Sequence, residues 1–114
     1  MIEVNQENFE SEVLKSVLPV VVDLWGPKCA PCLALMSDIT AMGEEFAGKV
    51  KFCKLNVAEN RRMAITLKVM GVPTFLFYKD GDLQGRITGA EVSREAVRDL
   101  ASKLAVSEAA VANL

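Results

Sequence analysis

Segments rich in apolar residues mark the strands that this chain predicts. The strongest begins at Val20 with three valines in succession, others occupy residues 50–57 and 74–78, and weaker ones lie at residues 2–4 and 83–88. An apolar run without polar alternation is typical of a strand buried on both faces, as in a parallel sheet. The run that begins at Val20 therefore predicts a strand that is buried on both faces of the sheet.

Helical spacing of apolar residues predicts four helices between and after these runs. They are expected over residues 7–17, from Cys32 to a stop at Gly48, over residues 60–69, and in a final segment capped by Ser93. Three of these helices have a clear core-facing side. Its residues are Phe9, Val13, Leu14 and Val17 in the first, Leu35, Met36, Ile39, Met42 and Phe46 in the second, and Val97, Leu100, Ala101 and Leu104 in the last.

The resulting order, β-α-β-α-β-α-β-β-α, predicts an α/β fold with a central mixed sheet flanked by helices. Strands joined through helices form right-handed parallel crossovers, whereas Asp80-Gly81 is typical of a hairpin turn between antiparallel strands. Gly85 lies inside the second hairpin strand and predicts a bulge. We expect one domain over residues 1–114, with its core at 2–105 and an alanine-rich tail at 106–114 that extends the last helix or frays.

Composition and charge argue against several classes of function. The 114 residues carry a formal net charge of −2, so a concentrated basic face for nucleic acid or an anionic membrane is not expected. The opening MIEVNQENFE lacks the basic and apolar regions of a secretory signal. The apolar runs are far shorter than the ~20 residues that cross a bilayer. We therefore expect a cytoplasmic monomer without a nucleic-acid or membrane partner.

Cysteine and histidine usage narrows the possible chemistry. The chain has three cysteines and no histidine, which removes the commonest general base and metal ligand. A zinc site would have to combine Cys29, Cys32, Cys53 and a carboxylate without a second spaced pair of ligands, so we expect no metal and no cofactor. Cys53 stands in the middle of a predicted strand, where a buried and unreactive thiol is expected.

Cys29 and Cys32 form a C-x-x-C pair where a predicted strand gives way to a helix. Two intervening residues can form a turn that brings the sulfurs within disulfide distance, and the helix N-terminus stabilises a thiolate. Cys29 starts the turn and is expected to be the accessible nucleophile, with Cys32 the shielded resolving thiol; Pro31 suits the first helical turn. Thiols that merely pack, or half of a metal site, are the alternatives, but the strand–helix context favours redox chemistry.

Several further segments carry a resemblance that covers nearly the whole chain. DLWGPKCAPC, KLNV, GVPTFLFYKDG and ITGA, in this order and at these separations, resemble the thioredoxin family from about Phe9 to Leu104. The resemblance implies the thioredoxin fold and thiol–disulfide exchange with protein substrates.

The resemblance also implies roles for individual residues. Cys29 and Cys32 match the redox pair, which forms the redox-active disulfide, Asp23 matches a buried aspartate with Lys54 near it, and Pro73 matches a cis-proline opposite the thiols. A cis turn would leave the backbone N–H and C=O of Val72 free to pair with a substrate strand. The residues expected to contact substrates are Trp25, Lys28, Ala30, Pro31, Gly71, Val72, Pro73, Gly89 and Ala90.

Asp23 interrupts the most apolar run of the chain. Burial raises the pKa of a carboxyl group, so Asp23 could accept the proton of Cys32 when this thiol attacks a mixed disulfide. Lys54 would moderate the pKa shift. A purely structural Asp–Lys pair is the alternative.

Three positions near the thiols depart from the family pattern and bear on partners more than on chemistry. Lys28 replaces a tryptophan, Ala30 a glycine, and Ala58 an acidic residue. The histidine that often separates the cysteines of disulfide-forming relatives is missing, which favours a reductant. We therefore predict an oxidoreductase that reduces disulfide-containing proteins and is regenerated by a thioredoxin reductase-type flavoprotein; the alternative is a binding module of this fold without redox turnover.

Overall fold

The computed structural model describes the backbone of residues 1–112 and the side chains of residues 1–105. Five strands form one sheet in the order β1-β3-β2-β4-β5. They are β1 (Ile2–Glu3), β2 (Val20–Trp25), β3 (Lys51–Asn56), β4 (Thr74–Lys79) and β5 (Asp82–Thr88). β3 runs parallel to β1 and β2, whereas β4 is antiparallel to β2 and β5. The predicted mixed sheet is confirmed.

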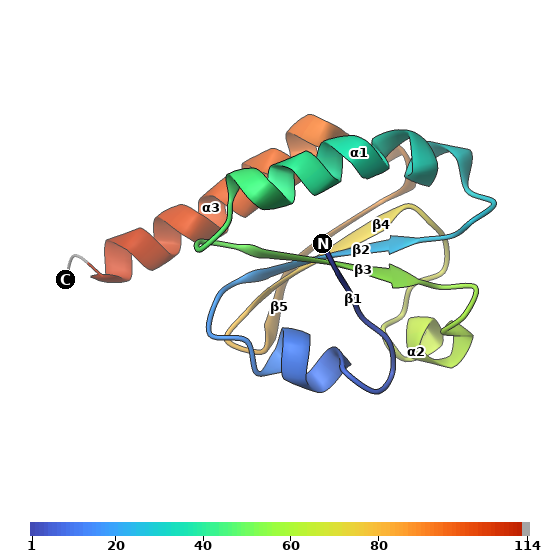
Figure 1. Ribbon diagram of the computed structural model, residues 1–114, viewed down its shortest axis with the longest axis horizontal. Coiled ribbons are helices and arrows are strands. Elements are labelled where there is room, and N and C mark those ends of the chain that lie inside the picture. Colours follow the sequence, from blue (N-terminus) through green and yellow to red (C-terminus); the bar gives the residue numbers. More distant parts are fainter. Residues whose placement is uncertain (113–114) are drawn as a thin grey trace.

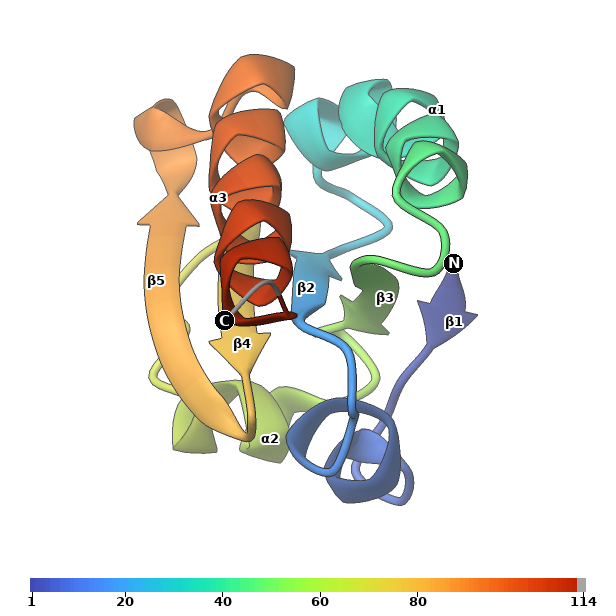
Figure 2. The same ribbon diagram turned by 90° about the vertical axis from the view of Figure 1, so that its left-hand side faces the viewer.

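Helices cover both faces of this sheet (Figures 1 and 2). α1 (Ala30–Glu45) and α3 (Arg94–Ala112) lie on one face, with α2 (Arg61–Thr66) and the π-helical segment η1 (Glu10–Leu14) on the other. A 3-10 turn, η2 (Gly89–Glu91), was not predicted. The alanine-rich tail extends α3 as far as Ala112, and residues 113–114 lie outside the described part. Within that part, no helix has the length and apolar character needed to span a membrane.

β2 occupies the most enclosed position in the sheet, between β3 and β4, and its first five residues are buried. Val20, Val22 and Leu24 pack in a core cluster with residues of η1 and α2, whereas Val21 packs with residues of α1 and α3. Because side chains alternate along a strand, Asp23 faces the same side as Val21. The carboxylate therefore points toward the layer of α1 and α3.

The helices of this layer bury the residues that their spacing predicts. Ile39 and Met42 of α1 and Val97 and Ala101 of α3 are all buried in one cluster. Ser93 caps α3, since its hydroxyl accepts a hydrogen bond from the backbone N–H of Ala96 at 3.0 Å. The expected cap of the final helix is confirmed. Of the other predicted core-facing residues, Leu35, Phe46 and Leu100 are half-buried against the same cluster, whereas Met36 is half-buried and not part of it.

The first helix is shorter than the predicted span of residues 7–17. Phe9 and Val13 are buried as expected, but Val17 is 88% exposed because η1 ends at Leu14. The Ser16 hydroxyl donates to the carbonyl of Leu18 at 2.8 Å, a local bond of the kind that competes with helical hydrogen bonding. The placement of Val17 in the core was therefore wrong, and so was that of Leu14, which is 38% exposed.

The hairpin between β4 and β5 has the predicted turn. Asp80 and Gly81 both adopt positive φ, 53° and 82°, as a tight hairpin turn requires. Phe77 pairs with Gly85 but the next residue pairs with Leu83, so the bulge lies next to Gly85, as predicted. A Cβ atom on Gly81 would lie 2.9 Å from the carbonyl oxygen of Leu14, so this turn also sits tightly against the end of η1.

Gly81→Ala should lower the free energy of unfolding by about 2–3 kcal/mol, because alanine combines an unfavourable positive φ with a backbone clash. Gly48→Ala is the matched control, since Gly48 has nearly the same φ, +83°, with nothing within 4 Å of a Cβ atom. It should lose only about 1 kcal/mol. Urea unfolding of both variants measures the difference. Equal losses would show that the contact with Leu14 relaxes freely.

Candidate functional site

Cys29 and Cys32 are joined by a disulfide, with their Cα atoms 5.3 Å apart. Cys29 is the N-cap residue of α1, and its sulfur accepts a hydrogen bond from the backbone N–H of Cys32 at 3.2 Å. Pro31 lies in the first helical turn, where its missing N–H leaves no helical bond unmade. The pair therefore lies where the carboxyl end of β2 leads into a helix N-terminus, which favours a thiolate.

The two sulfur-bearing residues differ in exposure. Cys29 is half-buried, whereas Cys32 is only 2% exposed and faces the interior from the first turn of α1. A partner can therefore approach Cys29 from solvent, while Cys32 is reached only from within the protein. This difference is the one expected for an attacking thiol and a resolving thiol.

Asp23 lies in β2 directly opposite Lys54 of β3 and is 2% exposed. Burial raises the pKa of Asp23 from an ordinary 3.8 to about 7, and the nearby charge of Lys54 lowers it by less. The direction agrees with the sequence-based expectation. The carboxyl group consequently changes its charge near neutral pH, as a group that exchanges a proton must.

Trp25 ends β2 beside this pair of charges. The Lys54 ammonium lies 5.8 Å from the centre of the indole ring, within the range of a cation–π contact. The indole Nε1–H is buried, and within the described residues it has no hydrogen-bond partner. Trp25 thus contacts the Lys54 ammonium and ends β2 where the loop that carries the cysteines begins.

The peptide bond between Val72 and Pro73 is cis, as the resemblance implies. The Pro73 carbonyl accepts a hydrogen bond from Gly89 N–H at 3.0 Å, and the Thr74 hydroxyl bonds to the carbonyl of Gly71 at 2.6 Å. These bonds fix the loop from both sides. In the described part of the chain neither backbone group of Val72 bonds to another residue, so both remain available to a partner strand.

A hollow of about 540 Å³ lies beside the disulfide and brings several predicted residues together. It is lined by Gly26, Pro27, Lys28, Cys29, Ala30, Pro31, Ala58, Arg61 and Val72. Gly71 instead lines a neighbouring hollow, and Gly89 and Ala90 line neither; they lie in η2, joined to the loop through the Pro73 carbonyl. Four of the predicted substrate-contact residues therefore lie together in one hollow beside Cys29: Lys28, Ala30, Pro31 and Val72.

Arg61 lines both hollows, and sequence reasoning did not select it. A signal was present, because Arg61 follows closely on the carboxyl end of β3, and ligands of α/β sheets bind at the carboxyl ends of parallel strands.

Cys53, by contrast, is buried and unpaired, as predicted, and burial raises the pKa of its thiol to about 11. Cys53 is therefore protonated and unreactive at neutral pH.

This chain is similar in sequence to known proteins over most of its length. The sequence model of the thioredoxin family matches residues 1–103. Thioredoxin of Acetoanaerobium sticklandii is 39% identical over 103 residues, which cover 90% of this chain and 98% of that protein. Thioredoxin of Peptoclostridium acidaminophilum is 35% identical over 103 residues, or 90% and 94% of the two chains. A chloroplastic M-type thioredoxin of Pisum sativum is 37% identical over 87 residues, or 76% and 51%.

Asp23→Asn should change how stability depends on pH. Because the pKa of Asp23 is about 7 in the folded protein and ordinarily 3.8, the folded state binds its proton more tightly. The resulting stabilisation is complete below about pH 4 and is lost as the pH rises through 7. Relative to wild type, the variant should therefore gain roughly 2–4 kcal/mol in unfolding free energy between pH 4 and pH 8.

Denaturant unfolding at several pH values, with the disulfide intact, measures this gain. Asp38→Asn, at an exposed aspartate of α1, serves as the control and should track the wild type. A constant difference between Asp23→Asn and wild type from pH 4 to pH 8 would contradict a raised pKa at Asp23.

Proposed function

The chain belongs to the thioredoxin family of protein-disulfide oxidoreductases, and on this premise we propose that it is a single-domain, monomeric reductant of protein disulfides in the cytoplasm. One observation carries the assignment: a disulfide at the N-terminus of α1 joins a partly accessible Cys29 to a buried Cys32. In the reduced protein the same arrangement exposes the Cys29 sulfur to a partner and keeps the Cys32 sulfur buried for the second exchange step.

Reduction takes two exchange steps. The Cys29 thiolate attacks one sulfur of the substrate disulfide; a bond forms between these two sulfurs, and the other substrate sulfur leaves as a thiolate. Cys32, once deprotonated, then attacks the Cys29 sulfur, which forms the protein disulfide and releases the second substrate sulfur. Two electrons pass from the protein dithiol to the substrate, and its two thiolates take up protons.

Asp23 is proposed to take the proton from Cys32 in the second step. Asp23 points toward the layer between the sheet and α1, Cys32 lies in the first turn of α1, and both are only 2% exposed, so solvent is a poor acceptor there. The pKa of about 7 lets Asp23 accept a proton and return it at neutral pH. Lys54, opposite Asp23, limits the rise of that pKa and keeps a fraction of the carboxyl group ionised.

Substrate is proposed to bind as an extended segment along the cis-proline loop. The unpaired backbone groups of Val72 can add a short strand next to Cys29. The remaining contacts are assigned to Trp25, Lys28, Ala30, Pro31, Gly71, Pro73, Gly89 and Ala90.

Turnover requires a second partner. The oxidised disulfide must receive two electrons and two protons, which we assign to a thioredoxin reductase-type flavoprotein. For this chain itself we propose no bound cofactor and no nucleic-acid or membrane partner.

Cys32→Ser should accumulate mixed disulfides with substrate proteins, because Cys29 can attack but the resolving sulfur is gone. Cys29→Ser should trap almost nothing, since Cys32 is buried. Non-reducing gels and mass spectrometry of extracts incubated with each variant compare the two. Equal trapping by both variants would overturn the assignment of nucleophile and resolving thiol. A wild-type protein that does not cycle with oxidant and reductant would indicate a binding module instead.

Asp23→Asn should slow release of the mixed disulfide at pH 7 by roughly 10-fold or more, because Cys32 loses its proton acceptor. Quenched-flow analysis of a preformed mixed disulfide separates this step from the initial attack, which should be nearly unchanged. Asp38→Asn provides the matched control. Unchanged release by Asp23→Asn would leave Asp23 and Lys54 as a structural pair.

A further inference from the structure

The hollow beside the disulfide is lined by cations although the chain as a whole is acidic. Both charged residues that line the hollow beside Cys29 are cations, Lys28 and Arg61, whereas the whole chain has a formal net charge of −2. Neither cation forms an ion pair within the described part of the chain, and both residues are exposed. A partner carboxylate could therefore meet both charges without displacing an internal partner.

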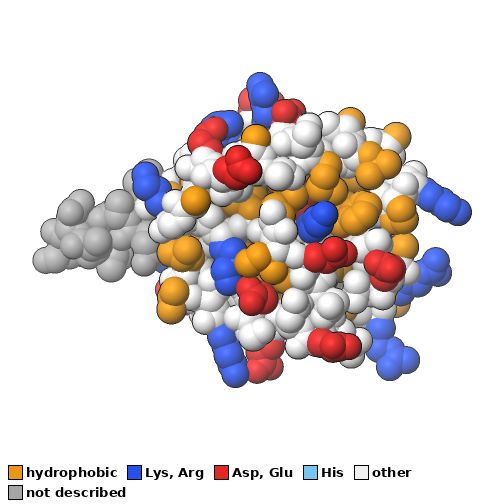
Figure 3. Space-filling model, viewed as in Figure 1, with side chains coloured by type: hydrophobic (Ala, Val, Ile, Leu, Met, Phe, Trp, Pro, Cys, Tyr) orange, Lys and Arg blue, Asp and Glu red, His pale blue; other side chains and the backbone are white. Residues whose placement is uncertain are grey.

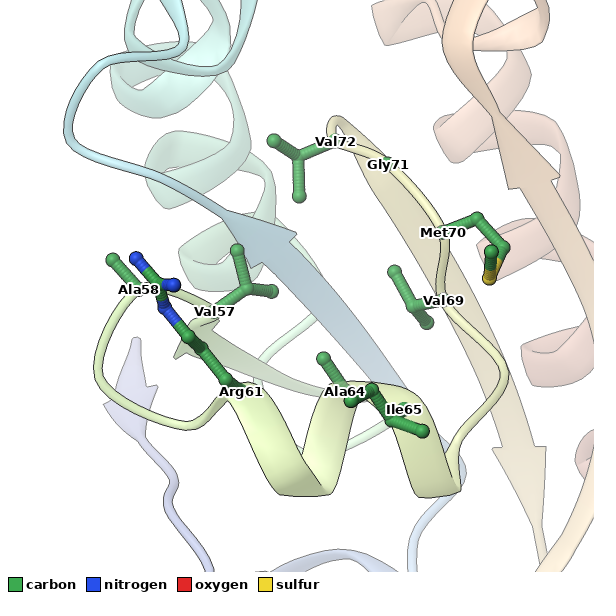
Figure 4. Close-up of a pocket in the computed structure, with 9 residues that line it drawn as sticks. All are labelled: Val57, Ala58, Arg61, Ala64, Ile65, Val69, Met70, Gly71 and Val72. Carbon is green, nitrogen blue, oxygen red and sulfur yellow. The ribbon is translucent and has the colours of Figure 1, made fainter.

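Arg61 is available to a partner because of its neighbour. Its side chain extends from the start of α2 toward the loop that carries Ala58, and Ala58 and Arg61 line the same two hollows (Figure 4). An alanine methyl group offers no acceptor, so the guanidinium fork, which suits bidentate binding of a carboxylate, stays open.

An apolar hollow of about 370 Å³ continues from the same point. It shares Ala58, Arg61 and Val72 with the hollow at the disulfide (Figure 4). Ile65 and Met70 on its rim are 72% and 96% exposed, and large exposed apolar side chains around a hollow are typical of a docking surface. In Figure 3 a band of hydrophobic side chains runs toward the edge of the molecule where the β2–α1 loop and α2 lie, and basic side chains project from this edge.

We propose that this joined surface selects protein disulfides whose reactive cysteine has a neighbouring carboxylate and a large apolar residue nearby. The carboxylate lies between Lys28 and Arg61, and the apolar side chain enters the hollow between α2 and residues 69–72. Val72 stands between the two subsites, so an extended segment that pairs with its backbone reaches both. This selectivity rests on the proposed reduction of protein disulfides and names the substrate class for it.

Disulfide-linked peptides test the charge subsite. In a matched set, Glu, Gln or Lys flanks the single cysteine on both sides, and a leucine stands three residues away. The rate constant for reduction by the reduced protein is divided by the rate constant with dithiothreitol, which removes differences in intrinsic reactivity. The Glu peptide should be favoured over the Gln peptide about 3–10-fold at low ionic strength, and the Lys peptide disfavoured. In 0.5 M salt the preference should fall below about 2-fold.

Two double variants with the same net charge test whether the preference for the Glu peptide comes from Lys28 and Arg61. Lys28→Glu with Arg61→Glu should reverse the preference, whereas Lys49→Glu with Arg62→Glu, at exposed cations that line neither hollow, should retain it. Because the readout is a ratio between peptides, any change in the reactivity of Cys29 itself cancels.

A peptide with serine in place of the leucine tests the apolar subsite. Ile65→Ser should reduce the preference for leucine over serine. Val17→Ser, at an exposed apolar residue that lines neither hollow, should leave this preference unchanged. Equal normalised rates for all peptides, or identical behaviour of the two double variants, would overturn the selectivity and leave disulfide reduction standing. Failure to reduce any peptide would overturn the proposed function itself.

Discussion

The enclosure of β2 on both faces and along both edges is the constraint on which the rest of the structure depends. β3 and β4 take up its two edges, and helices on both sides take up its side chains. A strand held in this way cannot shift its register without moving a whole set of buried residues to the wrong face. Its carboxyl end is therefore fixed, and the three residues after Trp25 bring Cys29 to the N-cap position of α1 in one defined place.

This enclosure also forces a conflict at Asp23. A carboxylate at a buried position opposes folding, and a pKa raised from 3.8 to about 7 corresponds to roughly 4 kcal/mol, a large part of the 5–15 kcal/mol typical of a domain. Lys54 offsets only part of this, since burial remains the larger influence on the pKa of Asp23. The same low-dielectric surroundings that make the charge unfavourable keep the pKa near neutrality. The burial of Asp23 therefore both lowers the stability of the fold and brings the pKa of its carboxyl group close to neutral pH.

Hydrophobic periodicity predicted the elements whose burial decides their structure. β2 and α3 followed from their patterns because their apolar faces meet the core along their length. Val17 fitted the helical pattern equally well, but local hydrogen bonding at Ser16 ends the helical segment before Val17 can reach the core. The turn η2 escaped prediction because it depends on a capping box in which the carboxylate of Glu91 accepts from Thr88 N–H, and no apolar period accompanies it.

The residues of the candidate site were predictable to different degrees, because some of their relations are local in the sequence and others arise only in the folded protein. The spacing of Cys29 and Cys32 is a local property, and their pairing follows from one turn of chain. The cis bond before Pro73 has no local signature in the residues and came only from the family resemblance. Arg61 belongs to the site because the β3–α2 turn carries it next to the loop after β2, a relation that exists only once the parallel pair β2–β3 has formed.

The proposed chemistry and the proposed recognition consequently occupy different layers of the molecule. Asp23 and Cys32 lie in the interior, where a substitution alters packing and charge burial together. Lys28, Ala58 and Arg61 lie at the surface around the accessible sulfur, where a substitution changes the charge that a partner meets and leaves the core intact. The departures from the family pattern at positions 28 and 58 fall in this outer layer. The exchange reaction can therefore stay constant while the set of disulfides that reach Cys29 changes.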